Sequence, residues 1–281
     1  MKSKDKISVI TLGCSKNTVD SERLLNQLKI NEFNLEDDPG KSETVIINTC
    51  GFIDAAKQES IDTILNAVEL KKKGKIKKVI VAGCLSERYL DDLKNEIPEV
   101  DAYFGTEKYD GILKELGGEL KRNLLGERLI TTPSHTAYLK ISEGCDHPCS
   151  FCAIPLMRGR HKSKNMDDLV REAEFLASNN TRELILIAQD TTDYGKDIYG
   201  KKVLGDLLNR LSDIKGIEWI GLMYAYPSQF PDDVIDVIAG NPKICKYVDI
   251  PLQHISDDVL KSMRRGVTAK RTRELLYKLR D

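Results

Sequence analysis

The chain has 281 residues, of which 41% are hydrophobic, and this length is sufficient for two domains with buried cores. Charged residues make up 31%, but the formal net charge is −1, so the basic footprint of a strong nucleic-acid binder is absent. No apolar run approaches the roughly 18 residues of a membrane helix, and the first residues, MKSKDKISVITLG, contain no signal-peptide core. We therefore expect a cytoplasmic protein without a membrane segment.

The first hundred residues alternate short apolar runs, rich in β-branched residues, with amphipathic stretches. Nearly continuous hydrophobicity is typical of buried parallel strands, and alternation with helices favours a doubly wound parallel sheet. We expect strands at 7–12, 44–49, 78–83 and 101–104. The helices are expected at 19–30, 53–73, 86–95 and 108–116. Together these elements predict an N-terminal α/β domain over residues 1–117.

A stretch with GGEL and TTPS, residues 118–134, is typical of a linker, and a second series of strands and helices follows it over residues 135–281. The expected strands are 138–142, 183–188, 217–224 and 246–250. The expected helices are 166–179, 202–214, 231–239 and 256–263. This spacing favours a parallel (β/α) barrel or half-barrel, whose chemistry lies at the carboxyl ends of its strands.

Three cysteines follow the three long strands of the first domain. Cys14 comes after ISVITLG, Cys50 after TVIINT, and Cys84 after KVIVAG. Because the carboxyl ends of parallel strands lie along one edge of a sheet, we expect the three thiols at one site. A helix N-terminus lowers the pKa of a cysteine, so these positions also favour thiolates. Single buried cysteines are common in cores, but three at equivalent strand ends indicate a shared ligand site.

The second set of cysteines lies in one short loop after the first strand of the second domain. The segment GCDHPCSFC holds Cys145, Cys149 and Cys152 in a C-x3-C-x2-C pattern. Soft thiolates at such spacing bind zinc or an iron–sulfur cluster. Zinc would need a fourth ligand, for which His147 and His161 are the nearby candidates. A four-iron cluster held by three cysteines instead keeps one iron open for a small molecule.

The same loop resembles the C-x3-C-x-aromatic-C signature of the radical S-adenosylmethionine (SAM) enzymes. The resemblance implies that Cys145, Cys149 and Cys152 hold a 4Fe–4S cluster whose open iron chelates the amino and carboxylate groups of SAM. It also implies that an electron from the cluster cleaves SAM to a 5′-deoxyadenosyl radical, which abstracts hydrogen from an unactivated carbon. Phe151 would then lie beside the adenine of SAM.

The segments around the first triad are similar to the methylthiotransferases, radical SAM enzymes with two clusters that convert C–H into C–S–CH3. The similar segments are GCSKNTVDSE, INTCGFIDAAKQES and VAGCL. The family implies that Cys14, Cys50 and Cys84 hold a second 4Fe–4S cluster, where the sulfur to be inserted is delivered. One SAM molecule would supply the methyl group and another the radical.

Four later segments resemble the RimO branch of this family: AIPLMRGRHKS, LIAQDTTDYG, YAYPSQF and DIPLQHIS. The MiaB-type branch, which modifies tRNA, carries a Gln-Asn-Val run where Gln189-Asp190-Thr191 stand here, and a Ser-Gly pair near His254-Ile255. The implied substrate is an aspartate of small-subunit ribosomal protein S-twelve, methylthiolated at its β-carbon on the free protein or the small ribosomal subunit. A tRNA adenosine is the alternative substrate. A non-catalytic zinc or redox-sensing module is the alternative from a different class of protein.

Further candidate residues stand near the ends of the strands expected in the second domain. Gln189 and Arg158 are predicted SAM contacts, Arg158 through the carboxylate of SAM or the charge of a cluster. Asp190, Tyr194 and His254 are predicted either to contact the substrate or to order the loops around it.

The second series of strands stops after four, inside a helical pattern that starts near Thr268. We therefore expect a partial radical SAM barrel in a chain truncated at its C-terminus. The resemblance implies that relatives continue into the rest of the barrel and a small β-barrel domain called TRAM, and we expect neither in these 281 residues. It also implies two partners besides the substrate: an electron donor such as flavodoxin or ferredoxin, and a sulfur donor.

Overall fold

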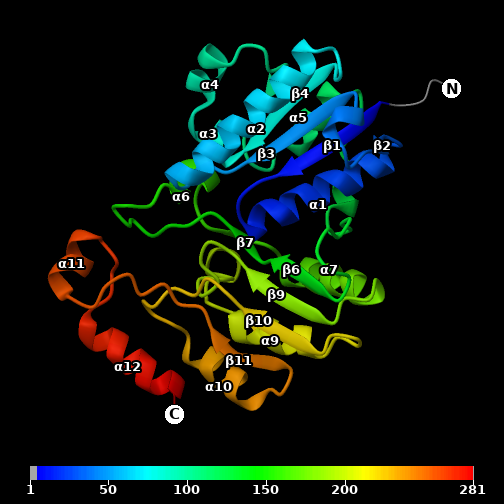
Figure 1. Cartoon of the computed structure of the whole chain (residues 1–281). Coiled ribbons are helices and arrows are strands. Elements are labelled where there is room, and N and C mark those ends of the chain that lie inside the picture. Colours follow the sequence, from blue (N-terminus) through cyan, green and yellow to red (C-terminus); the bar gives the residue numbers. More distant parts are fainter. Residues whose placement is uncertain (1–4, 281) are drawn as a thin grey trace. The chain divides into compact units, whose positions relative to one another are not determined.

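A computed structural model describes residues 5–280, and these form two compact units (Figure 1). The first unit runs to Thr131 and includes the short segment Leu156–Arg158. The second unit contains Thr132–Pro155 and the residues from Gly159 onward. No helix within residues 5–280 combines the length and hydrophobicity that a membrane crossing requires.

The first unit is built on a five-stranded sheet in the order β2-β1-β3-β4-β5, and every pair of neighbours is parallel. Its strands are β1 (Lys6–Thr11), β2 (Asn34–Leu35), β3 (Thr44–Thr49), β4 (Lys78–Gly83) and β5 (Ala102–Tyr103). Its helices are α1 (Ser15–Ile30), α2 (Asp54–Lys72), α3 (Cys84–Arg88), α4 (Leu90–Glu96) and α5 (Tyr109–Glu115), with 3-10 turns at η1 (Pro39–Lys41) and η2 (Arg122–Leu124).

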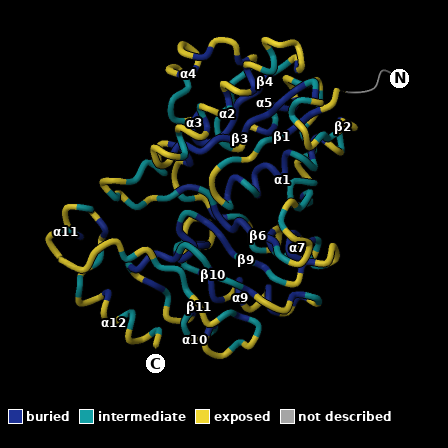
Figure 2. Tube along the Cα trace, in the orientation of Figure 1, coloured by how far each residue is buried: buried dark blue, intermediate teal, exposed yellow. Residues whose placement is uncertain are grey.

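Helices cover both faces of this sheet. Since successive residues of a strand point to opposite faces, neighbouring residues of one strand pack into different cores. Val45 and Ile47 of β3 belong to one core with Ile64 of α2. Ile46, the residue between them, belongs to the opposite core with Leu28 of α1. Figure 2 accordingly shows β3 as buried along its length, and β4 is buried from Val79 onward. The predicted doubly wound α/β fold is confirmed.

Most of the stretch 118–134, for which the composition predicts a linker, packs with the first unit as far as Thr131. The Arg128 guanidinium donates to the Glu22 carboxylate at 2.6 Å, and both side chains are almost fully buried. The other oxygen of Glu22 accepts from the backbone N–H of Thr131 at 2.9 Å. A buried ion pair in place of a hydrophobic pattern explains why the sequence of this stretch resembles a solvated loop.

The second unit contains a four-stranded parallel sheet in the order β11-β10-β9-β6 and a two-stranded antiparallel ribbon, β7-β8. Its strands are β6 (Thr136–Lys140), β7 (Ser142–Glu143), β8 (Lys162–Ser163), β9 (Glu183–Ile187), β10 (Trp219–Leu222) and β11 (Ile244–Val248). Its helices are α7 (Met166–Ser178), α8 (Lys196–Tyr199), α9 (Leu204–Ser212), α10 (Asp232–Gly240), α11 (Asp257–Ser262) and α12 (Ala269–Arg280), and α6 (Ile154–Arg158) crosses the unit boundary.

Alternate residues of the central strand β9 differ in burial, because they point to opposite faces of the sheet. Leu184 and Leu186 are fully buried, while Ile185 between them is only half-buried. The amphipathic helices α7 and α9 bury leucines such as Leu169 and Leu207 completely. The alternating strands and helices therefore form the predicted (β/α) half-barrel. The helical pattern that starts near Thr268 is α12.

Candidate metal centres

The first cysteine triad lies at one edge of the first unit's sheet. Cys14 precedes α1 as its N-cap residue, Cys50 follows β3 directly, and Cys84 is the first residue of α3 after β4. Burial raises the pKa of Cys50 and of Cys84, and a negative charge on Cys14 would raise both further. Since Cys14 interacts electrostatically with both partners, the three sulfurs share one neighbourhood.

The expectation that these cysteines favour the thiolate is wrong for the buried members of the triad. The pKa of Cys84 is raised to about 11, because loss of hydration outweighs the nearby positive charge of Arg158. The pKa of Cys50 is also raised, although the backbone N–H of Phe52 opposes the shift. A thiophilic metal group would therefore have to displace protons when it binds, as metal centres in proteins commonly do.

A glycine with a left-handed backbone allows the first and second cysteine loops to meet. Gly13, just before Cys14, has φ +90°. A Cβ atom at this position would lie 2.6 Å from Cys50 Cβ and 2.9 Å from Cys50 Sγ. Glycine is therefore required both for the backbone conformation and for the space.

Asn17 in the first turn of α1 connects all three loops of the triad. Its amide nitrogen donates to the carbonyl of Leu12 at 2.7 Å and to the carbonyl of Thr49 at 3.0 Å. Its oxygen lies 3.9 Å from Cys84 Sγ. The side chain is fully buried. Asn17 therefore holds the chain before Cys14 and Cys50 against the third cysteine, a role that the sequence pattern did not indicate.

Arg158, for which the sequence predicts a contact with SAM, belongs to the first unit and lies beside this triad. Its Nε donates to Cys84 Sγ at 3.2 Å, and its Nη1 donates to Asp20 at 2.7 Å. Its Nη2 donates to the oxygen of Asn17. The side chain is 2% exposed. Of the two partners that the sequence suggested, SAM or a cluster, the contacts favour a cluster at Cys84.

The second triad gathers in the loop that follows β7. Burial raises the pKa of Cys145 to about 12, and negative charges on Asp190, Cys152 and Cys149 would add to the rise. The loop is closed by backbone bonds from Cys152 N to the carbonyl of Cys149 at 3.1 Å and from Cys145 N to the carbonyl of Gly159 at 3.1 Å. All three cysteines are half-buried. Three cysteines of one loop that interact electrostatically and have partial access to solvent suit a cluster with one open iron.

Two residues that the sequence did not single out contact this loop. Arg265 Nη1 donates to Cys149 Sγ at 3.5 Å, and the Tyr226 hydroxyl lies 3.6 Å from the same sulfur. The Arg265 guanidinium stands 4.2 Å from the centre of the Tyr226 ring. Tyr226 lies in the YAYPSQF segment, so the branch motif marked its neighbourhood. Arg265 carries no local signal, because only the fold brings it to the cysteines.

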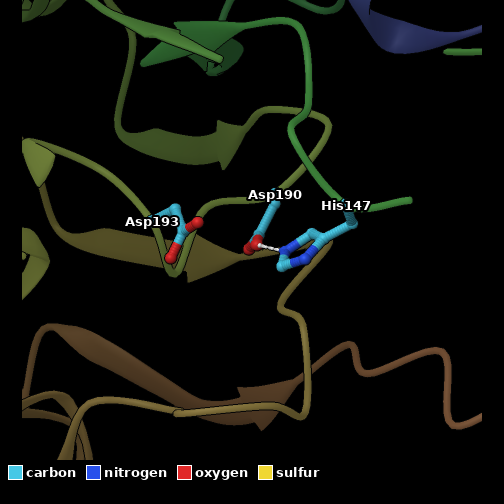
Figure 3. Close-up of side chains that lie close together, drawn as sticks. All are labelled: His147, Asp190 and Asp193. Carbon is cyan, nitrogen blue, oxygen red and sulfur yellow. Dashed lines mark hydrogen bonds and ion pairs between the residues drawn. The ribbon is translucent and has the colours of Figure 1, made fainter. Parts of the chain in front are cut away.

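His147 and Asp190 form a bonded pair beside the second triad (Figure 3). His147 Nε2 and an Asp190 oxygen are 2.6 Å apart, and the His147 ring stacks on Tyr226 with 3.6 Å between centroids. Asp193 offers a further oxygen nearby, but its carboxylate also pairs with Lys202 at 2.8 Å. The ligand atoms of these three residues lie within 4.8 Å of one another, so the group also has the spacing of a metal site.

Gln189 and Phe151 remain available to a ligand. Gln189 Nε2 donates to Glu143 at 2.8 Å, whereas its oxygen is buried and has no hydrogen-bond partner within residues 5–280. An unpaired buried acceptor costs free energy unless a ligand satisfies it. The Phe151 side chain is 48% exposed. An apolar ring left in solvent beside the cysteines suits contact with a flat ligand.

The three residues expected at substrate or in loops have contacts typical of loop structure. Asp190 is almost fully buried and accepts from Thr192 N at 2.8 Å. Tyr194 is fully buried, and its hydroxyl donates to the carbonyl of Lys164 at 3.0 Å. His254 is exposed, and its Nδ1 accepts from the backbone of Ser256 at 2.9 Å.

Two family models match the chain. The model of the uncharacterized protein family UPF0004 matches residues 6–105. The model of the radical SAM superfamily matches residues 139–281, which is half of the chain. The chain therefore belongs to the radical SAM superfamily. Membership implies a 4Fe–4S cluster and SAM as cofactors, and the second triad supplies thiolate ligands of the required softness.

The resemblance to the RimO-type methylthiotransferases is also confirmed. The chain is 58% identical over 280 residues to the ribosomal protein uS12 methylthiotransferase RimO of Cytophaga hutchinsonii, and 57% identical over 278 residues to that of Chloroherpeton thalassium. Both matches cover 99% of this chain and 64% of the relative. The chain thus spans 64% of the length of these two curated relatives.

Solved radical SAM structures share the fold at low sequence identity. The methyltransferase TsrM from Kitasatospora setae superposes with a TM-score of 0.67 at 14% identity, covering 98% of this chain and 65% of that chain. The cobalamin-dependent enzyme OxsB gives a TM-score of 0.66 at 11% identity and covers 98% of this chain and 48% of that chain. At such identity these matches support the fold alone.

Proposed function

We propose that this chain carries the two cofactor sites of a methylthiotransferase that modifies ribosomal protein uS12, the protein called S-twelve above. The single observation that carries the proposal is the 58% identity to an enzyme of that name over 99% of this chain. The proposed reaction inserts a methylthio group at the β-carbon of an aspartate. Such a reaction has to activate a C–H bond that acid–base groups alone leave inert, which is why a radical source is needed.

Cys145, Cys149 and Cys152 would hold the radical SAM cluster. When bound, the cluster and SAM supply a radical able to abstract hydrogen from carbon. The chain's own residues have positioning roles in this proposal. The unpaired oxygen of Gln189 would accept a hydrogen bond from the amino group of SAM, and the exposed ring of Phe151 would pack on its adenine. Arg265 and Tyr226 hold the Cys149 sulfur in the loop.

Cys14, Cys50 and Cys84 would hold a second 4Fe–4S cluster. Their position at one sheet edge and the absence of a competing bond between them support this assignment, since all three are free cysteines. Soft thiolate donors match iron–sulfur chemistry better than they match a hard cation. The second cluster supplies the site for the sulfur that is inserted. Methylation of that sulfur by a second SAM molecule would complete the methylthio group.

The proposed reaction needs two further partners. An electron donor, such as a flavodoxin or a ferredoxin, would reduce the radical SAM cluster, and a sulfur donor would replace the sulfur that leaves with the product. A ribosomal substrate places the proposed reaction in the cytoplasm. The substrate is uS12 itself or the small ribosomal subunit that contains it.

Mass spectrometry of uS12 tests the proposal in cells that lack the gene. We expect the methylthio group on uS12 to disappear and to return with the native gene. It should not return with a gene carrying Cys84→Ala or Cys149→Ala. Cys245→Ala, which changes the cysteine of β11 outside both triads, is the matched control and should restore the modification. Unchanged uS12 together with loss of methylthio-adenosine from tRNA would refute the ribosomal substrate.

A further inference from the structure

Arg158 ends a segment that is anchored in the first unit. Thr106 Oγ1 donates to the backbone carbonyl of Met157 at 3.1 Å, and Met157 is 2% exposed. Arg158 is the last residue of α6, and its side chain continues into the interior of the same unit. The backbone before Arg158 is therefore fixed to the first unit, and the guanidinium is buried within that unit.

Asp20 forms an ion pair with this buried guanidinium. The Nη1–Asp20 bond is 2.7 Å long, and Asp20 also accepts from the Tyr109 hydroxyl at 3.2 Å. A guanidinium usually reaches its strongest pairing when two N–H groups meet one carboxylate. One N–H of this guanidinium, that of Nε, is directed at Cys84 Sγ at 3.2 Å.

The use of a sulfur as an acceptor has a chemical meaning. A neutral thiol is a weak acceptor, whereas a thiolate accepts a charge-assisted hydrogen bond. The arrangement around Arg158 therefore gains most when Cys84 is a thiolate, which is its form as a metal ligand. Asn17 supports the geometry, because both of its amide hydrogens already bond to backbone carbonyls and its oxygen is left for Arg158.

We propose that Arg158 is a positioning residue for the second cluster: its guanidinium holds the Cys84 thiolate and makes the bound cluster easier to reduce. Hydrogen bonds to ligand sulfurs and nearby positive charge are two of the factors that set the potential of an iron–sulfur cluster. Reduction adds a negative charge, which the buried guanidinium stabilises. This inference rests on the proposed function, since it assumes that the first triad binds a cluster.

The test uses the whole chain with Cys145, Cys149 and Cys152 replaced by alanine, so that only the second cluster contributes iron. Arg158→Gln removes the positive charge. Arg158→Lys keeps the charge but replaces the guanidinium with an ammonium group that has fewer N–H donors. Arg160→Gln is the matched control, because that arginine is 93% exposed. Iron and acid-labile sulfide are measured per chain after anaerobic reconstitution, and the reduction potential is measured by a titration followed with electron paramagnetic resonance.

We expect Arg158→Gln to shift the reduction equilibrium about tenfold toward the oxidised cluster, which is about 59 mV for one electron. Arg158→Lys should keep most of the parent's potential, and Arg160→Gln should keep all of it. Equal potentials in Arg158→Gln and Arg160→Gln would overturn the inference. If Arg158→Gln binds no iron, Arg158→Lys decides: iron with a potential near the parent's supports the inference, and no iron refutes it.

The iron content of the triple-alanine parent shows separately whether the first triad binds a cluster. The triple-alanine parent with native Arg158 should bind about four irons. A parent without iron would show that the first triad holds no cluster, whatever the residue at position 158. Normal iron in the parent with an unchanged potential in Arg158→Gln would instead leave the second cluster in place and reject only the role of Arg158.

Discussion

Replacing Gly13 by alanine should separate the loops of Cys14 and Cys50. At this position φ is +90°, and an added Cβ would lie 2.6 Å from Cys50 Cβ. A left-handed backbone costs a residue with a side chain about 1–2 kcal/mol. Overpacking a tight site adds about 1–3 kcal/mol. We therefore expect Gly13→Ala to lower the free energy of unfolding of the metal-free chain by about 2–5 kcal/mol.

Gly74→Ala provides the matched control for this substitution. Gly74 lies in the turn between α2 and β4 of the same unit, has φ +69°, and has no atom within 4 Å of an added Cβ. It should therefore cost only the backbone term of about 1–2 kcal/mol. Both substitutions restrict the unfolded chain similarly, so that effect cancels in the comparison. The difference between the two variants measures the overlap with Cys50.

Urea unfolding of the metal-free variants and iron analysis after reconstitution provide the assay. We expect Gly13→Ala to lose about half of the roughly eight irons of a two-cluster chain and Gly74→Ala to lose none. Equal losses of stability in the two variants, together with equal iron contents, would refute the packing of Gly13 against Cys50. The same result would remove the main support for the close approach of the first two cysteine loops.

Three further substitutions test other parts of the structure. Glu22→Gln should lower the free energy of unfolding by about 3–5 kcal/mol, because it leaves the buried Arg128 charge without its carboxylate; a change below about 1 kcal/mol would contradict the buried pair. Tyr194→Phe should cost about 0.5–1.5 kcal/mol, because it removes the hydrogen bond from the buried hydroxyl to the Lys164 carbonyl, while iron content stays unchanged; loss of iron would contradict a purely structural role. His147→Ala removes both the hydrogen bond to Asp190 and the ring stack beside the second triad and should lower iron from about eight to about four per chain; full iron content would show that the loop folds without this histidine.

The sequence alone was sufficient to predict the class of fold and the two cysteine triads. Buried parallel strands have nearly continuous hydrophobicity, so the strands ending before Cys14, Cys50 and Cys84 could be read locally, and their common sheet edge follows from parallel topology. The spacing of the second triad lies within one short loop. These features depend on neighbours along the chain, and local patterns describe them well.

Tertiary structure alone decided which side chains surround the cysteines. Arg158 follows the second triad in the sequence, yet its guanidinium contacts Cys84 of the first triad. Arg265 reaches Cys149 from 116 residues away, and Asn17 reaches Thr49 across 32 residues. Such contacts between polar groups have no periodic signature, because hydrogen bonds form wherever the fold brings a donor to an acceptor. The cysteines proposed as ligands could therefore be identified from the sequence, whereas the contacts of the residues around them could not.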